Sequence, residues 1–390
     1  MSRFSAQGLA HLTVVTGNYP SPACPTHGTF VRQFAHAVAR QGVRCTVIQP
    51  VAVHDAWRNR GYPVHDLEDA GGDARVAVYR PRFLSVSARE SLAFLGVLSP
   101  SRLTLQRFTA AVRRVMRNHQ IRPDALYGHF LYLAGAAVVR IGREMDIPAF
   151  PCVGESDLWT VRKFGLPEAR RTLALATGFL ANSSALKRTL IQDLGITADR
   201  IGVFPNGANL TCFKPRDQCS ARERLDLPQD QFLVASVGSF SYRKGVFRVG
   251  EAIKDMENVG GVFAGSGPMP PRGPNTVLCR PVLHEDIPDL LSASDVFVLP
   301  TLAEGSCNAL VEAMACGLPI ISSTGEFNDD LLDDSMSIRV DPLDVGAIRR
   351  AIMELHHHPE RRAAMAEAAQ KRSRAFDVNE RARRMLAFMS

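Results

Sequence analysis

Residues 295–322 read DVFVLPTLAEGSCNALVEAMACGLPIIS and decide the fold. The apolar run at 295–299 predicts a buried strand, and a polar loop and a helix that ends at Gly317 follow it. Ser306 is a good N-cap for this helix, and Pro319 opens a second apolar run that predicts another strand. A strand, a helix and a second strand in this order are typical of a parallel βαβ unit, so the stretch predicts an α/β fold.

Two acidic residues flank the start of this helix. Glu304 lies in the loop at the carboxyl end of the first strand, and Glu312 lies two turns into the helix. The backbone amides between them form a helix N-terminus, which attracts anions. These amides belong to Ser306, Cys307, Asn308 and Ala309. One carboxylate is therefore placed to bind hydroxyl groups beside a phosphate, and the other to bind a second hydroxylated ring. From the spacing alone, two solvated glutamates in an ordinary βαβ unit remain the alternative.

Short β-rich runs alternate with helical patterns along the whole chain of 390 residues. In the first half, strands are expected at 12–16, 44–49, 125–127, 149–153 and 178–181. In the second half, they are expected at 232–237, 261–264, 295–299 and 319–322. The alternation restarts after a polar, proline-containing stretch, which predicts a linker near 207–216. We therefore expect two doubly wound, Rossmann-like domains, residues 1–206 and 207–373, that face a central cleft at the carboxyl ends of their strands.

The segment from Glu304 to Glu312 resembles the E-x7-E element of the retaining glycosyltransferases of family 4, also called glycosyl transferases group 1. Further segments resemble the same family: PNGAN (205–209), VGSF (237–240), RKG (243–245), FAGSGP (263–268), GTFV (28–31), YGHF (127–130) and VGESD (153–157). The resemblance implies the GT-B fold, with acceptor binding in the first domain, donor binding in the second, and a C-terminal helix at 374–390 that crosses back to the first. It also implies a nucleotide diphosphate sugar as the donor, and a glycan or lipid-linked acceptor in envelope, capsular or exopolysaccharide biosynthesis.

The resemblance gives individual residues expected roles on the donor side. Glu312 would hold the nucleotide ribose, and Glu304 would lie against the donor sugar. Arg243 and Lys244 follow a strand and precede a helix, so they are placed to hold the charge that grows on the leaving diphosphate. The remaining positions expected to bind donor are Gly28, Ser239, Gly265 and Gly267. Ser239 departs from the family pattern, which often has arginine there.

On the acceptor side, His129 is expected to donate or accept a hydrogen bond at the sugar near the reacting carbon. A structural histidine is the alternative when the residue is taken without the family pattern. Glu155 and Asp157 are expected to position the acceptor or the sugar. The resemblance implies a front-face mechanism, in which the donor phosphate itself takes the acceptor proton, so neither acid is expected to be a general base.

The charge is unevenly distributed. Residues 1–180 carry a balance of +10 and residues 181–390 a balance of −3, within a net charge of +7. Eight arginines and one acid lie between Arg80 and Arg117, interleaved with large apolar residues. This composition predicts contact with an anionic membrane surface, and a helix pair with solvated arginines is the alternative. No aromatic stacking pattern or recognition motif points to nucleic acid.

Several other classes of protein are not expected. The eight cysteines form no CxxC pair and no apolar run reaches the ~20 residues of a membrane span, which predicts a cytoplasmic protein with reduced thiols. Contact through the arginine-rich segment would place it at the inner face of the plasma membrane. No metal and no cofactor are expected, because residues 356–358 place three histidines on different helix faces and no Asp-x-Asp occurs. Two alternative functions stay open: a sugar-nucleotide epimerase on the same fold, and a non-catalytic sugar- or membrane-binding module.

Overall fold

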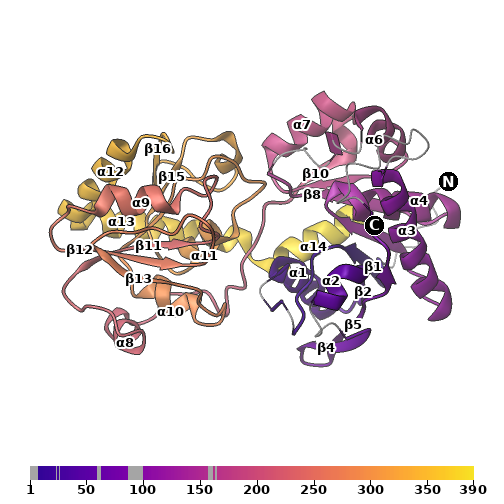
Figure 1. The fold of residues 1–390 in the computed structure, drawn as a ribbon, viewed down its shortest axis with the longest axis horizontal. Helices are drawn as coiled ribbons and strands as arrows, with labels where there is room; N and C mark the ends of the chain where they lie inside the picture. The colour runs from indigo at the N-terminus through magenta and orange to yellow at the C-terminus, as the bar shows by residue number, and fades with distance from the viewer. Residues whose placement is uncertain are drawn as a thin grey trace. The chain divides into compact units, whose positions relative to one another are not determined.

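The computed structural model describes residues 8–22, 24–25, 27–58, 63–86, 100–156, 161–162 and 165–390. The chain divides into two compact units (Figure 1). The N-terminal unit comprises Met1–Phe204 and Asn379–Ser390, and the C-terminal unit comprises Pro205–Val378. The boundaries between the units thus lie after Phe204 and after Val378. The sequence predicts these boundaries after residues 206 and 373.

The N-terminal unit is built on a sheet that has, within the described residues, eight strands in the order β10-β9-β8-β7-β1-β2-β5-β4. The strands are β1 (His11–Thr16), β2 (Arg44–Ile48), β4 (His65–Gly71), β5 (Ala74–Tyr79), β7 (Ala125–His129), β8 (Ala149–Val153), β9 (Phe179–Ala181) and β10 (Ile201–Val203). The edge strand β4 is antiparallel to β5, and the other neighbours are parallel. A short pair, β3 (Val51–Ala52) and β6 (Arg82–Phe83), lies outside this sheet.

Amphipathic helices cover this sheet because each buries one apolar face. They are α1 (Thr29–Arg40), α3 (Pro100–Asn118), α4 (Ala136–Met145), α6 (Leu166–Leu173), α7 (Ser184–Leu194) and α14 (Val378–Met389), with short turns η2 (Leu131–Gly135) and η3 (Ala198–Arg200). The short helix α2 (Val53–Arg58) packs beside β3 and β6 instead. On α1, for example, Phe34 and Val38 lie four residues apart on one helix face, and both are buried. The described part of the core also contains Leu105, Val138 and Phe179.

The C-terminal unit has a parallel sheet with the order β13-β12-β11-β14-β15-β16. Its strands are β11 (Phe232–Val237), β12 (Val259–Ala264), β13 (Thr276–Arg280), β14 (Val296–Leu299), β15 (Ile320–Ser323) and β16 (Ser337–Val340). Its helices are α8 (Gln218–Arg224), α9 (Val246–Ile253), α10 (Ile287–Ser292), α11 (Asn308–Ala315), α12 (Val345–His357) and α13 (Pro359–Ser373), with short turns η4 (Glu326–Asn328) and η5 (Arg374–Phe376). The predicted α/β class with doubly wound parallel sheets is thereby confirmed.

The strand order brings three loops together. Strand β11 lies between β12 and β14, and all three are parallel, so the loops that follow them leave the same edge of the sheet. These loops contain residues 238–245, 265–267 and 300–307. The polar residues that the sequence singles out in the second half therefore lie at one edge.

The structure contains strands that the sequence prediction lacks. The sequence prediction misses the hairpin of β4 and β5, and the edge strands β10, β13 and β16. Helix α4 begins at Ala136 and no earlier, because Leu133 has a left-handed φ of 59° that cannot continue a helix.

The arginine-rich segment between Arg80 and Arg117 is described except for residues 87–99, which lie outside the described part of the chain. Arg80 is itself buried, and its guanidinium donates to the oxygens of Gln49 and Pro20. The apolar side chains of Leu105 and Phe108 are buried in the core. The described apolar residues of α3 therefore pack inward, as in the alternative interpretation of a helix with solvated arginines.

No helix in the described ranges is both long and apolar enough to span a bilayer.

Candidate functional site

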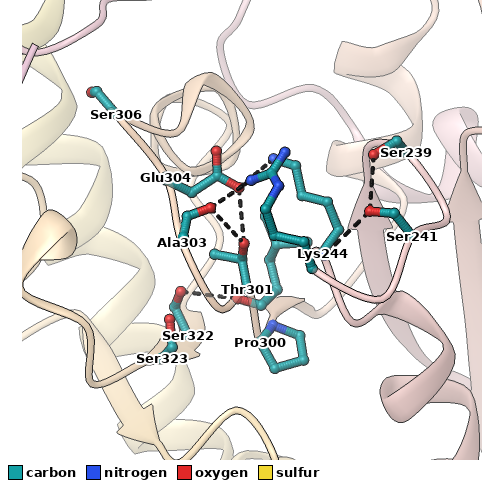
Figure 2. Close-up of polar contacts among 12 residues, drawn as sticks. Ser239, Ser241, Lys244, Pro300, Thr301, Ala303, Glu304, Ser306, Ser322 and Ser323 are labelled. Atoms are coloured by element: carbon teal, nitrogen blue, oxygen red, sulfur yellow. Dashed lines mark hydrogen bonds and ion pairs between the residues drawn. The ribbon is translucent and has the colours of Figure 1, made fainter. Parts of the chain in front are cut away.

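Two cations and one carboxylate converge at the carboxyl edge of the C-terminal sheet. Lys244 Nζ lies 2.7 Å from Glu304 Oε1, and Arg243 Nη1 donates to the same oxygen at 2.9 Å. Thr301 Oγ1 is a third donor to Glu304 Oε1, at 2.9 Å (Figure 2). Arg243 also donates to the carbonyl of Ala303. The structure thus brings together three residues that the sequence predicts in one site, and two positive charges there face a single negative charge.

The two cations differ in their exposure to solvent. The Lys244 side chain is 14% exposed and the Arg243 side chain 41% exposed, against 10% for Glu304. Burial alone lowers the pKa of Lys244, but the charge and the hydrogen bond of the neighbouring Glu304 carboxylate oppose this, and the pKa lies above its ordinary value. Burial raises the pKa of the Cys307 thiol to about 11, so this thiol is neutral at physiological pH. Lys244 is therefore a permanent, well-enclosed positive charge.

Arg248 on α9 supports this loop and was not predicted. It is buried, and its guanidinium donates from Nη1 to the carbonyl of Tyr242 at 3.1 Å and from Nη2 to that of Pro300 at 2.9 Å. The guanidinium also lies 4.9 Å from the ring centroid of Phe247. It thereby joins the loop that carries the cations to the loop that carries Glu304. In the sequence, the signal for this role is a charged residue on an otherwise apolar helix face.

The loops after β11 and β12 pack directly against each other. A Cβ atom on Gly265 would lie 1.9 Å from the carbonyl oxygen of Gly238, so only glycine fits at 265. Gly267 is similarly confined by the carbonyl of Phe240. Ser239 is exposed on the first loop, and its hydroxyl contacts that of Ser241 at 3.4 Å (Figure 2). These glycines therefore have a role in the protein's own packing, and their contact with a donor stays a prediction.

The start of α11 corrects the predicted N-cap. The helix begins at Asn308 with Cys307 as its N-cap, so Ser306 lies before the helix. The Ser306 hydroxyl instead accepts the backbone N–H of Asn206 at 2.9 Å, and the Asn206 side-chain amide donates to the Ser306 carbonyl at 2.9 Å. Asn206, at the start of the C-terminal unit, therefore takes the hydrogen bond of the Ser306 hydroxyl that a helix N-cap would use. The first amides of the helix are those of Asn308 and Ala309.

Glu312 lies inside α11 and is buried. Its Oε1 lies 3.1 Å from Nε2 of His284, a residue of the loop between β13 and α10 that was not predicted. The His284 ring packs edge-on against Phe213, with a centroid distance of 5.3 Å. The sequence offered little signal for this contact, because the strand before His284 was itself missed.

In the N-terminal unit, His129 is the last residue of β7 and is buried. The Tyr127 hydroxyl lies 2.7 Å from His129 Nδ1, and the rings of Phe30 and Phe130 lie 5.2 Å and 4.5 Å from the imidazole. Burial, with a smaller contribution from the positive charge of Arg381, lowers the pKa of His129 to about 3. The imidazole is therefore neutral and suited to hydrogen bonding rather than to proton donation at neutral pH.

The backbone after His129 is strained and held by Glu155. Phe130 has a φ of 73° and Leu133 a φ of 59°, both left-handed values that cost energy in non-glycine residues. Glu155 Oε1 accepts the backbone N–H of Leu131 at 2.6 Å, and Oε2 accepts that of Gly154 at 3.0 Å. Glu155 thus stabilises the loop that follows His129.

Two predicted residues of the first half remain: Gly28, expected to bind the donor, and Asp157, expected to position the acceptor or the sugar. Gly28 precedes α1 with a φ of 77°, and a Cβ there would lie 2.5 Å from the backbone of Asn18, so the packing of the chain itself requires glycine. An approach of donor phosphates to Gly28 stays a prediction. Asp157 lies outside the described residues. Among the residues that are described, no group of three or more His, Cys, Asp or Glu side chains is arranged to hold a metal ion.

Two family models match consecutive parts of the chain. The model described as Glycosyltransferase Family 4 matches residues 27–211, and the model described as Glycosyl transferases group 1 matches residues 217–372. Over 357 residues, the chain is 26% identical to the Bacillus subtilis (strain 168) protein TuaC, assigned as a teichuronic acid biosynthesis glycosyltransferase, with 88% of each chain covered.

Two solved structures resemble the whole chain. Sucrose-phosphate synthase from Thermosynechococcus elongatus has a TM-score of 0.77 at 20% identity, with 96% of this chain and 97% of that chain covered. Anabaena HepE in complex with UDP has a TM-score of 0.69 at 18% identity, with 96% and 98% covered. The likeness thus extends over both units.

Proposed function

Since the chain belongs to the glycosyl transferases group 1 and has the GT-B fold, it is a glycosyltransferase, and we propose that it transfers the sugar of a nucleotide diphosphate sugar with retention of configuration. The acceptor in this proposal is a glycan or a lipid-linked sugar of an envelope, capsular or exported polysaccharide. The similarity to TuaC, a protein assigned to teichuronic acid biosynthesis, supports this acceptor class.

The observation that carries the proposal is the cation pair at Glu304. Lys244 and Arg243 supply two positive charges, and Glu304 neutralises one of them, so the group has a surplus positive charge beside the start of α11. A diphosphate gains negative charge as its bond to the sugar breaks, and a preorganised positive group lowers the energy of that transition state. Lys244 is less exposed than Arg243 and is expected to contribute more, because screening by water is weaker around it.

The proposed reaction needs no covalent intermediate. The acceptor hydroxyl oxygen bonds to C1 of the donor sugar on the face from which the diphosphate leaves. The C1–O bond to the diphosphate breaks, and the hydroxyl proton passes to an oxygen of the leaving phosphate. His129, which is neutral, would hold the sugar by a hydrogen bond, and Glu304 would lie against the sugar.

Two substitutions test the site. Lys244→Ala should lower the rate of nucleoside diphosphate release in an acceptor screen by about 100-fold or more. Glu312→Ala should raise the KM for the donor. Lys254→Ala is the matched control, since Lys254 is exposed and pairs with Glu251 at the end of α9. Wild-type kinetics in both site variants would refute the assignment.

The stereochemistry and the class of reaction have their own test. Proton NMR of the product should show the anomeric configuration of the donor, and an inverted product would contradict the proposed mechanism. Incubation with donor alone separates transfer from epimerisation, because an epimerase converts its donor without an acceptor.

We also propose that the cations, and no metal ion, stabilise the leaving diphosphate. Their positions next to Glu304 support this. Turnover should then be unchanged after dialysis against EDTA. A loss of turnover that Mg²⁺ or Mn²⁺ restores would contradict this part of the proposal.

The nucleotide base is proposed to be uracil, a choice that rests on the fold shared with HepE, which was solved with UDP. A panel of UDP, GDP, ADP and CDP in a thermal unfolding assay tests it, since a ligand raises stability by RT ln(1 + [L]/Kd). UDP should give the largest increase in Tm.

Association with the cytoplasmic face of the membrane is proposed to depend on charge, because the large apolar residues Leu105, Phe108 and Val112 of α3 are buried. The chain should then sediment with liposomes that contain anionic lipid and be released by high salt. Sedimentation that does not depend on anionic lipid would contradict this proposal.

A further inference from the structure

His284 contacts Glu312 across two elements that are far apart in the sequence. His284 lies in the loop between β13 and α10, and Glu312 lies in α11. The 3.1 Å distance from His284 Nε2 to Glu312 Oε1 is that of a hydrogen bond. The ring of His284 also packs against Phe213, which is buried in the core. The histidine is therefore held on one side by an aromatic contact and on the other by the carboxylate.

Glu312 depends on this contact. Its side chain is 9% exposed, and a buried carboxylate is costly unless hydrogen-bond donors surround it. Among the described residues, His284 is the side chain that contacts the Glu312 carboxylate. The bond engages Oε1, so it also sets the direction in which Oε2 points.

We propose that His284 is a positioning residue for the nucleoside: it orients Glu312 so that the carboxylate accepts hydrogen bonds from the ribose hydroxyls of the donor. This inference rests on the proposed function, in which Glu312 holds the ribose. A carboxylate that is oriented in advance loses less entropy on binding and rejects a sugar that lacks the hydroxyl, because its oxygen is then left without a partner. His284 is thereby a determinant of selection for ribonucleotides over deoxyribonucleotides.

A purely structural role makes a different prediction. If His284 only neutralises a buried charge, its loss destabilises the unit and weakens ribo- and deoxyribonucleotides equally. If it orients Glu312, its loss reduces the preference for the ribonucleotide. The ratio of the two affinities therefore separates the two roles, whereas stability does not.

The test is calorimetric titration of UDP, 2′-deoxy-UDP and 3′-deoxy-UDP into the full chain, with GDP and ADP and their deoxy forms used in the same way. The wild type should bind the ribonucleotide about tenfold or more tightly than at least one deoxy form. His284→Phe keeps the ring contact with Phe213 and removes the donor, so this ratio should fall towards one. His284→Gln keeps an N–H donor and should retain part of the ratio. Glu285→Gln, a change at the exposed neighbouring residue, should leave the ratio at the wild-type value.

Each outcome is decisive. Collapse of the ratio in His284→Phe, with partial recovery in His284→Gln, supports the inference. A wild-type ratio in His284→Phe, or equal binding of ribo- and deoxyribonucleotides by the wild type, overturns it while leaving nucleotide binding itself intact. If no diphosphate binds, the proposed function fails, and the inference fails with it. If His284→Phe does not fold, the comparison of His284→Ala with His284→Gln decides the question by the same ratio.

Discussion

His129 illustrates how the surroundings of a single residue set its chemistry. A histidine at the end of a strand is ambiguous in sequence, because the same residue serves as an acid, a base, a ligand or a neutral hydrogen-bonding group. Here the imidazole is buried beside Phe30 and Phe130, and Tyr127 contacts its Nδ1 atom. The neutral form is therefore the stable one, and we expect no ionisation of His129 in the pH dependence of turnover near neutrality.

The lowered pKa of His129 also predicts how stability depends on pH. Its value of about 3 in the folded chain lies below the ordinary 6.5, so unfolding takes up a proton within that range and stability falls as the pH drops through it. The slope is at most ~1.4 kcal/mol per pH unit. Urea unfolding should therefore show that the free energy of unfolding falls less between about pH 7 and about pH 5 for His129→Gln than for the wild type. The difference should be up to ~2 kcal/mol. His27→Gln, at an exposed position, should behave like the wild type, and an equal loss in all three proteins would contradict this account of His129.

At the scale of elements, the site depends on how α9 is attached to the strands beside it. Arg248 donates to the carbonyls of Tyr242 and Pro300, which lie on the loops after β11 and β14. These loops carry Lys244 and Glu304, so one buried guanidinium sets the distance between the cation and the acid. Backbone carbonyls have no sequence signature, which is why this role becomes visible only in the structure.

A matched pair of substitutions tests the role of Arg248. Arg222 is also buried, and it donates to the carbonyl of Ala293 and pairs with Asp295 at the amino end of β14, away from the site. Arg248→Leu and Arg222→Leu should each destabilise the chain by about 2–4 kcal/mol, since each leaves buried oxygens without donors. At temperatures well below the unfolding midpoints of both variants, Arg248→Leu should lower kcat by about tenfold or more, whereas Arg222→Leu should leave kcat unchanged. Equal kcat values in the two variants would show that Arg248 has no influence on Lys244 and Glu304.

At the scale of the whole molecule, the chain passes from the N-terminal unit into the C-terminal unit at Pro205 and returns at Asn379. The returning residues contribute Arg381, a buried arginine whose guanidinium donates to the carbonyl of Phe204 and to the side chain of Asn182. The last residues of the sequence thus stabilise the unit that contains the first.

Arg381→Met should therefore lower the stability of the N-terminal unit and leave the C-terminal unit unchanged. Hydrogen exchange measured by mass spectrometry resolves the two units, and protection should fall in the peptides around Asn182 and Phe204. Arg383→Met is the control, because Arg383 is exposed and pairs with Glu380 on the same helix. Loss of protection in both units, or in neither, would contradict this assignment.

Much of the fold was predictable because its central strands are buried on both faces. The run at β14 is continuous and apolar, and the run at β11 is apolar except for one serine, which is typical of parallel sheets between helices. The hairpin of β4 and β5 was missed because it lies at an edge, and β4 in particular carries exposed polar residues. Edge strands need fewer apolar residues, so their pattern is weak.

The candidate site was predictable where chemistry and spacing coincide. Lys244 and Glu304 follow adjacent parallel strands, and that topology alone brings them to one edge. The N-cap at Ser306 was wrong because Asn206, a hundred residues earlier in the sequence, takes the hydroxyl. The roles of Arg248 and His284 were missed for the same reason: each contacts residues far away in the sequence, which spacing along the chain does not reveal.

The central claim is that Lys244 holds the diphosphate of a sugar nucleotide. Calorimetric titration of UDP and uridine into the wild type and into Lys244→Ala tests it most directly, because the two ligands differ only in the diphosphate. We predict that the wild type prefers UDP strongly and that Lys244→Ala loses about tenfold or more of its affinity for UDP while its affinity for uridine is unchanged. Equal affinities for UDP in the two proteins, or an equal loss for both ligands, would contradict the account.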